Sequence, residues 1–436
     1  MNFDLVTYEL GELGSLKNGA NFNKNDAGDG CPVMSVKQLF RGRFVDTEGL
    51  GSIKLGTLKK LDDYLVKKND LLFARSSLKA EGSGQVAIVN EYPQNCIFSG
   101  FTIRFRVFDE SKVNPLYLYY LLRSPKYREI FVRITTGSVI SNLTQATLSK
   151  IPVELPNKET QDYVANIFDE LDRKRELGAA TNQTLEQLAQ AIFKSWFVDF
   201  DPVKAKMNGE QPEGMDAATA SLFPEKLDSE TGIPVGWSQG IIADIAKLNA
   251  KSWTKKNQPE QVHYVDLANT KNGVIETVTT YDFDEAPSRA RRVLNSGDTI
   301  VGTVRPGNRS FAFIGETEQP LTGSTGFAVL SPKEEFWTSF VYLATTNDDA
   351  IDEYARLADG GAYPAIKPVV VADTPCVIPT TDIAQKFWQL TGAMLKKAHQ
   401  NRLENEELAK LRDTLLPKLL SGEIELGETE EMAEVN

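Results

Sequence analysis

A long apolar seam that occurs twice is the feature that most constrains how this chain can fold. Between Asn157 and Phe200, apolar residues recur at spacings of three and four, which is the heptad pattern of a helix that packs against another helix. A second seam follows at an offset of 223 residues, and the matched positions are Val164 with Phe387, Ile167 with Leu390, Leu171 with Met394, Leu185 with Leu408, Leu188 with Leu411 and Ile192 with Leu415. The sequence therefore predicts two related long helices.

The length of these helices predicts that they pair. A helix of about 38 residues is about 57 Å long at 1.5 Å per residue, which is more than its own domain can cover. The repeat is the obvious partner, and antiparallel pairing would relate the two halves of the chain by a pseudo-two-fold axis. Polar residues interrupt the middle of both seams, namely Lys174, Gly178 and Thr181 in the first and Lys397, Asn401 and Glu404 in the second. They either fix the register of the pair or mark a solvated gap between the helices.

The region that precedes each long helix also repeats. Short β-rich runs such as Cys96–Val107 alternate with turns, and Asn114–Ile134 then has a helical pattern. Weak matches in the same order pair Asp70 with Asp298 and Phe101 with Phe327. The fold class is thus predicted as α+β, with two repeated α+β domains separated by two long antiparallel helices that form a coiled coil.

This repeat sets the domain boundaries that we expect. They are a first domain over 1–156, a central long helix over 157–200, a surface linker over 201–235, a second domain over 236–379, a C-terminal long helix over 380–420 and an acidic tail over 421–436.

Charge and cysteine content bear on the partners and the compartment. The net charge is −12, but the placement of charge decides which partner binds, and the tail holds six acidic residues. Three widely spaced cysteines, Cys31, Cys96 and Cys376, favour a reducing compartment. No basic and apolar N-terminal signal precedes Tyr8, and no apolar run approaches the length of a membrane span, so we expect a cytoplasmic protein.

Basic residues cluster in both repeats and predict a DNA-binding surface. Cationic side chains neutralise phosphates, while Arg, Lys, Asn and Gln read base edges. The candidates are Lys37, Gln38, Arg41, Arg43, Arg75 and Lys79 in the first domain, and Lys271, Arg289, Arg291, Arg292, Arg305 and Arg309 in the second. A solvated surface is the alternative for each cluster taken alone, and their presence in both repeats favours DNA.

A turn rich in small residues recurs before each long helix, as Thr135–Asn142 and Ala358–Ala365. Glycine in these turns permits close approach to a backbone, so the candidate DNA contacts include Ser138, Asn142 and Tyr363. A turn that only closes the domain is the alternative interpretation.

An aromatic stripe ends the first long helix. Phe193, Trp196 and Phe197 are candidates for binding a partner protein. Packing within their own domain is the alternative.

Motifs for catalysis or metal binding are weak in this sequence. The G-x-G-x-x-A pattern at Gly82 precedes a strand-like run where a dinucleotide site needs a helix, and the N-P-L-Y run at Asn114 lacks the second proline of the adenine-binding loop of amino-methyltransferases. Neither His263 nor His399 has a ligand at metal-binding spacing. We therefore expect a non-catalytic protein without a metal site.

Three segments carry a resemblance to a known family, namely Ala191–Pro224, Ile233–Trp237 and Leu411–Leu426. With them the chain resembles, over nearly its whole length, the specificity subunit of type I restriction-modification enzymes. The resemblance implies two target recognition domains that each read one half of a bipartite DNA sequence, and helices that set the unread gap. Because GGAYPA in the second domain differs from TTGSVISN in the first, the target would be asymmetric.

The resemblance also implies partners. They would be two modification subunits that use S-adenosylmethionine to methylate adenine, and two restriction subunits that are ATP-dependent and use Mg²⁺, whereas this chain would bind no cofactor. The sequence leaves two other classes open: a stand-alone DNA-binding regulator, which would need no partner, and a DNA methyltransferase, which would bind S-adenosylmethionine itself.

Overall fold

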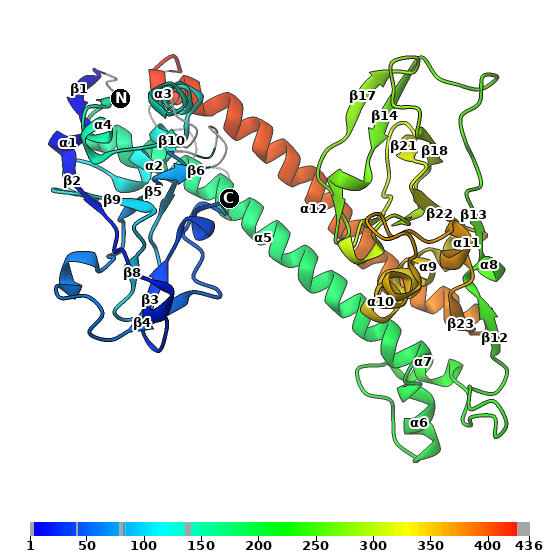
Figure 1. The fold of residues 1–436 in the computed structure, drawn as a ribbon. Helices are drawn as coiled ribbons and strands as arrows, with labels where there is room; N and C mark the ends of the chain where they lie inside the picture. Colours follow the sequence, from blue (N-terminus) through cyan, green and yellow to red (C-terminus); the bar gives the residue numbers. More distant parts are fainter. Residues whose placement is uncertain (1–3, 41, 78–81, 83, 136–140, 425–436) are drawn as a thin grey trace, which may run out of the picture. The chain divides into compact units, whose positions relative to one another are not determined.

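The computed structural model describes residues 4–40, 42–77, 82, 84–135 and 141–424 (Figure 1). The chain divides into two compact units, unit 1 with Met1–Arg175 and Glu406–Asn436, and unit 2 with Glu176–Asn405. Two long helices, α5 (Lys158–Phe197) and α12 (Thr381–Ser421), each contribute one half to each unit. The α+β class and both long helices are confirmed.

Unit 1 is built on two sheets. The first has four antiparallel strands in the order β2 (Gly14–Asn18), β9 (Thr102–Val107), β5 (Leu71–Ala74) and β7 (Val86–Ile88), and the second has the order β4 (Gly51–Lys54), β3 (Gly30–Met34) and β8 (Ile97–Phe98). Strand β1 (Val6–Glu9) pairs with β11 (Pro152–Leu155), just before α5. Helices α2 (Pro115–Arg123) and α3 (Pro125–Thr135) follow β9. Asn114 caps α2, because its Oδ1 accepts hydrogen bonds from the backbone N–H groups of Leu116 and Tyr117.

Unit 2 repeats this order. Its first sheet runs β13 (Ala246–Leu248), β22 (Phe327–Pro332), β19 (Thr299–Gly302) and β20 (Phe311–Phe313), and its second runs β17 (Thr279–Asp282), β14 (Gln261–Val265), β21 (Leu321–Ser324) and β18 (Ala290–Leu294). Helices α9 (Thr338–Thr346), α10 (Asp348–Leu357) and α11 (Pro368–Ala372) follow, and β12 (Ser238–Ile241) pairs with β23 (Pro375–Ile378) before α12.

The strand register shows how closely the two first sheets correspond. Leu71 on β5 lies opposite Phe105 on β9, and Thr299 on β19 lies opposite Leu330 on β22. By this register Phe327 corresponds to Thr102, so the sequence match of Phe327 with Phe101 is wrong by one residue.

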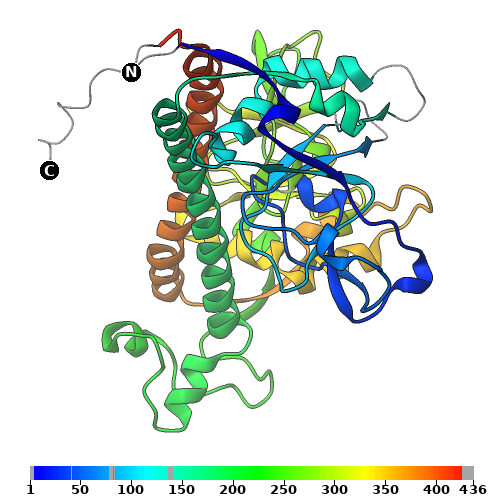
Figure 2. The same ribbon diagram turned by 90° about the vertical axis from the view of Figure 1, so that its left-hand side faces the viewer.

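Within each unit the two long-helix segments run antiparallel. In unit 1, Arg412 of α12 contacts Asp172 of α5. In unit 2, the rings of Phe193 and Phe387 lie 6.2 Å apart between centroids. The colours in Figure 2 show the same direction, since the start of α5 lies beside the end of α12.

The segment expected as a surface linker contains two short helices, α6 (Asp201–Met207) and α7 (Ala217–Leu222). They lack a visible apolar period because each is only one or two turns long. Val203 is fully buried, and Phe223, at the end of α7, packs edge to face on Trp196 with centroids 5.0 Å apart. This part of the chain therefore belongs to the core of unit 2.

Among the described residues, no helix combines the length and the apolar composition needed to cross a membrane. All three cysteines have free thiols.

Candidate nucleic-acid interface

Two arginines in unit 2 are presented by a tight turn. Arg305 and Arg309 flank the 3-10 helix η6 (Pro306–Asn308), and both have left-handed backbones, with φ of 49° and 60°. Such a backbone is costly for residues other than glycine and persists only where the surrounding structure holds it in place. The turn follows β19 directly, so the sheet fixes its position.

The second candidate turn of unit 2 meets the first one. The Arg305 backbone N–H donates to the Pro364 carbonyl at 2.7 Å, and its guanidinium donates to the Ala362 carbonyl at 2.8 Å. The same guanidinium lies 4.8 Å from the ring centroid of Tyr363, which is 71% exposed. A cation over an aromatic face is attracted by the ring, so Tyr363 orients Arg305 while both stay accessible. Two candidates that were chosen separately thus form one exposed pair.

Arg309 is held by partners on the other side of the turn. Its Nε donates to the Asn272 side chain at 3.0 Å, and its Nη2 lies 2.6 Å from Asp348. Lys271 precedes Asn272 and is exposed. The structure therefore brings Lys271 and Arg309 to the same part of unit 2.

The remaining candidate arginines of unit 2 lie on or beside β18. Arg289 donates to Asp266 at 2.7 Å and to the Tyr264 hydroxyl at 3.0 Å, and its side chain is 57% exposed. Arg291 lies over the ring of Phe283 at 5.0 Å. Arg292 donates to Ser252 at 3.2 Å, and partial burial lowers the pKa of its guanidinium.

The turn at residues 325–326 is hydrogen-bonded both to Arg289 and to the segment between the end of β19 and Arg305. Thr325 donates its backbone N–H to the Arg289 carbonyl at 2.8 Å, and Thr303 donates to the Gly326 carbonyl at 2.8 Å. The backbone segments that carry Arg289 and Arg305 therefore both contact this turn. Sequence reasoning missed the exposed Asn308, whose only signal is its place between the two arginines.

The candidates in unit 1 are less uniform. Lys37 is exposed, but Gln38 is 2% exposed and accepts a hydrogen bond from the Ser35 backbone N–H at 3.0 Å. Arg43 is 5% exposed and forms an ion pair with Asp169 of α5. Because Gln38 and Arg43 are buried and have partners inside unit 1, we assign them a structural role and leave them out of the surface proposed below.

Arg75 is the unit 1 candidate that most resembles the unit 2 arrangement. Its guanidinium donates to the Gly100 carbonyl at 3.2 Å, and its backbone N–H donates to the Phe101 carbonyl at 2.9 Å. Phe101 is 67% exposed, so an arginine again lies beside an exposed aromatic residue, which sequence reasoning missed.

Four unit 1 candidates cannot be placed as side chains. Arg41, Lys79 and Ser138 lie outside the described residues, and only the backbone of Asn142 is described, where β10 (Ser141–Asn142) pairs with β6 (Ser76–Ser77).

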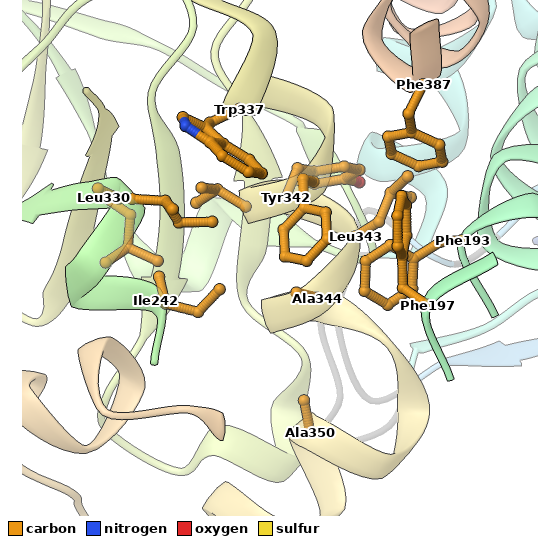
Figure 3. Packing of buried hydrophobic residues seen from close by; sticks show 14 of the residues in the cluster. Phe193, Phe197, Ile242, Leu330, Trp337, Tyr342, Leu343, Ala344, Ala350 and Phe387 are labelled. Atoms are coloured by element: carbon orange, nitrogen blue, oxygen red, sulfur yellow. The ribbon is translucent and has the colours of Figure 1, made fainter. Parts of the chain in front are cut away.

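The three aromatic residues expected to bind a partner lie in the core of unit 2. Figure 3 shows Phe193 and Phe197 among the buried side chains of this core. Phe193, Trp196 and Phe197 are 5%, 6% and 3% exposed, and the ring of Phe197 lies 4.8 Å from Phe387 and 4.9 Å from Phe340 between centroids. The structure gives them the packing role that the sequence left open as the alternative. Docking of a partner on these side chains would need them to leave the core.

No three His, Cys, Asp or Glu residues in the described parts of the chain gather as ligands for a metal ion.

Comparison with known proteins finds a DNA specificity domain in this chain. Residues 2–187 match the family model of the type I restriction modification DNA specificity domain. The type I restriction enzyme HindI specificity subunit of Haemophilus influenzae is 26% identical, over 97% of this chain and the whole of that protein. The MjaIX specificity subunit of Methanocaldococcus jannaschii is 25% identical, over 72% of this chain and 69% of that protein.

The fold itself has a solved counterpart. The crystal structure of the S subunit of a type I restriction-modification system from M. genitalium superposes with a TM-score of 0.58 at 16% identity, over 96% of each chain. Fold and sequence together define a DNA specificity protein built from repeated α+β domains. These matches support a specificity subunit of a type I restriction-modification system, the non-catalytic component that determines which DNA target is recognised.

Proposed function

We propose that the two α+β domains each read one half of a bipartite, asymmetric DNA target, and that the chain thereby directs adenine methylation or ATP-dependent cleavage by partner subunits. The observation that supports this most is a shared scaffold with unlike surface groups. Corresponding strands lead into the Arg305–Tyr363 pair in unit 2 and into the Arg75–Phe101 arrangement in unit 1. Two domains with the same scaffold but different surface side chains could read two half-sites of different sequence.

The chemistry of recognition would follow from these groups. Lysines and arginines such as Lys271 and Arg309 would neutralise phosphates, which makes binding strongly dependent on salt. A bidentate arginine on a guanine edge discriminates against a wrong base by about 1 to 3 kcal/mol, and Arg305 is the exposed candidate for such a contact. The adenine to be methylated would be flipped out of the duplex by a partner subunit.

We propose two modification subunits and two restriction subunits as partners. S-adenosylmethionine, ATP and Mg²⁺ would be bound by those partners and not by this chain. The long helices would set the length of the unread gap, the acidic tail would be solvated, and the complex would work in the cytoplasm. The domain boundaries expected from the sequence stay part of this proposal, except that the segment 201–235 packs on the core of unit 2 and is not a free surface linker.

The test is to sequence methylated adenines in the genome of the host, with and without this gene. The expected result is a two-part motif with unequal halves that disappears on deletion. A methylation pattern that does not change would contradict the proposal.

A second experiment separates the alternative functions. A tagged chain should co-purify with a methyltransferase subunit, whereas a stand-alone regulator would bind its sequence without one. Calorimetric binding of S-adenosylmethionine by the purified chain alone would instead identify a methyltransferase.

A further inference from the structure

The turn that opens strand β5 in unit 1 recurs at strand β19 in unit 2. Asp70 accepts a hydrogen bond from the Lys67 backbone N–H at 2.6 Å, and Asp298 accepts one from the Asn295 backbone N–H at 2.7 Å. Both aspartates also accept at their backbone carbonyls from the neighbouring strand segment, at 2.8 and 2.9 Å. Asp70 is 0% exposed and Asp298 is 3% exposed, so each turn holds a buried carboxyl group.

The two carboxyl groups differ in what faces them. In unit 1, Arg106 of β9 forms a bidentate pair with Asp70, with Nε 2.6 Å from Oδ1 and Nη2 2.7 Å from Oδ2. Arg106 follows Phe105, and in the register of unit 2 the residue at that place is Ser331, which follows Leu330. Among the described residues, no Lys or Arg forms a salt bridge with Asp298.

A cavity of about 350 Å³ lies beside Asp298 and Ser331, the place that the guanidinium of Arg106 takes beside Asp70 in unit 1. Asp298 and Ser331 line it together with Trp388, Glu316 and Glu335. At roughly 30 Å³ for each molecule of liquid water, this volume is large enough for a small organic ion.

The basic groups in the cavity wall are engaged elsewhere. Lys396 lies 3.6 Å from Glu335 and 5.4 Å from the ring centroid of Trp388, and His399 bonds through Nε2 to the Glu316 carbonyl at 2.9 Å. Burial raises the pKa of Asp298 above its ordinary value, against the weaker effects of hydrogen bonds from Asn295 and Ser331 and of the charge of Lys251. A buried carboxylate without a cation is unfavourable, and a guanidinium fits it best because two parallel hydrogen bonds form.

We propose that this cavity binds a small alkylguanidinium ion, with the guanidinium on Asp298 in the place of the missing arginine and the rest of the ligand beside Trp388, Glu316 and Glu335. This site is made mainly by the turn before β19, by the end of β22 and by α12, and it does not use the Arg305 turn. It is therefore independent of the proposed reading of DNA.

The test is isothermal titration calorimetry of the full chain with agmatine, an alkylguanidine that also carries a primary amine. We expect one molecule bound per chain. Asp298→Asn should weaken binding about tenfold or more, because the amide keeps the hydrogen bond from Asn295 but loses the charge. Asp284→Asn, an exposed carboxyl on the segment after β17, is the matched control and should bind as the wild type does.

Ser331→Arg provides a second and independent arm. The introduced arginine should pair with Asp298 as Arg106 pairs with Asp70, so agmatine binding should be lost and the melting temperature should rise. Ser331→Ala should leave the cavity open and retain binding. Two outcomes would overturn the proposal: no heat of binding with the wild type, or the same affinity in Asp298→Asn as in the control Asp284→Asn, which would show that agmatine only follows the net negative charge.

Discussion

Asn401 on α12 donates through Nδ2 to Oδ1 of Asn182 on α5 at 2.9 Å, inside the helix pair of unit 2. Asn182 in turn donates to the Ala398 carbonyl at 3.0 Å. The offset of 223 residues maps Gly178 onto Asn401 and Asn182 onto Asn405, and the Asn405 amide lies against Gly178, where a Cβ would be 2.9 Å from its Oδ1. The same two helix positions therefore meet twice, as a pseudo-two-fold axis requires. This contact favours a role in register over a solvated gap.

Replacing Asn401 should destabilise the helix pair. Asn401→Ala removes the donor and leaves the Asn182 amide short of a partner, at a cost of about 1 to 3 kcal/mol in the free energy of unfolding. Lys397→Ala, an exposed position on the same helix, is the control and should change it by less than about 0.5 kcal/mol. Urea denaturation followed by circular dichroism measures both, and equal midpoints would contradict the assigned role.

The two arginines that pair with Asp169 should differ in their effect on stability. The Arg43 side chain is 3% exposed and the Arg173 side chain is 71% exposed. Arg43→Ala removes the buried partner and leaves the Asp169 carboxylate with only the exposed Arg173, so it should cost about 3 kcal/mol, the lower end for a broken buried pair. Arg173→Ala removes only a surface pair and should cost about 1 kcal/mol or less. Denaturation midpoints that rank the variants in the reverse order would disprove the structural role of Arg43.

Removing the ring under Arg305 should weaken DNA binding. Tyr363→Ala frees the guanidinium and should cost about 0.5 to 1 kcal/mol, the usual worth of an exposed cation–π contact. Tyr363→Phe keeps the ring and should bind nearly as the wild type does. Fluorescence anisotropy with the methylated motif, using the chain assembled with its modification subunits, measures the affinities. If the alanine and phenylalanine variants bind equally, the ring has no orienting role.

The partly buried carboxyl of Glu186 should make stability depend on pH. It accepts a hydrogen bond from the fully buried Tyr342 hydroxyl at 2.5 Å, and burial raises the pKa of Glu186 above its ordinary 4.5, although Tyr342 and the charge of Arg402 oppose this. A raised acid pKa means that the unfolded chain releases this proton first, so folding loses stability as the pH rises from about 4.5 through the folded-state pKa.

Glu186→Gln removes this titration and keeps a hydrogen-bonding side chain. The wild type should therefore lose stability relative to the variant as the pH rises over that range, in urea titrations at several pH values. The exposed Glu318→Gln variant controls for the change in net charge. A difference between wild type and Glu186→Gln that stays constant with pH would contradict the assignment.

Lengthening both long helices should widen the gap between half-sites. Seven residues inserted after Gly178 and seven before Asn405 keep the heptad seam and preserve the contacts on both sides of the insertions. At 1.5 Å per residue the insertion adds about 10.5 Å, which is about three base pairs at 3.4 Å each. Sequencing of methylated adenines should report the wider spacing, and methylation at the original spacing would disprove the spacer role.

The features that the sequence predicted well are those with a local period or a repeat. The heptad seams fixed α5 and α12, because each turn of a long helix adds to the same pattern. Helices α6 and α7 were missed because each buries only a few apolar residues, such as Val203, which leaves no periodicity to detect.

Side-chain roles were harder to predict because they depend on contacts between distant residues. Arg43 looked like its basic neighbours, yet Asp169, more than a hundred residues away, turns it into a core ion pair. Arg305 and Tyr363 were chosen for their residue types, and only the backbone bond from Arg305 to Pro364 shows that they meet.

The two polar contacts in the helix pair differ, and this difference predicts how the first and second halves of the chain would associate if they were separated. Two copies of the second half, paired antiparallel, would place Asn401 opposite Asn405 at both equivalent sites, whereas two copies of the first half would place Gly178 opposite Asn182 twice. The pairing found here has one contact between two asparagines, Asn182 with Asn401, and one between a glycine and an asparagine, Gly178 with Asn405. Self-association would thus favour two copies of the second half, which have the contact between asparagines twice. Covalent continuity through α6 and α7 is what commits each helix to its unlike partner, because it raises the effective concentration of that partner above any other copy.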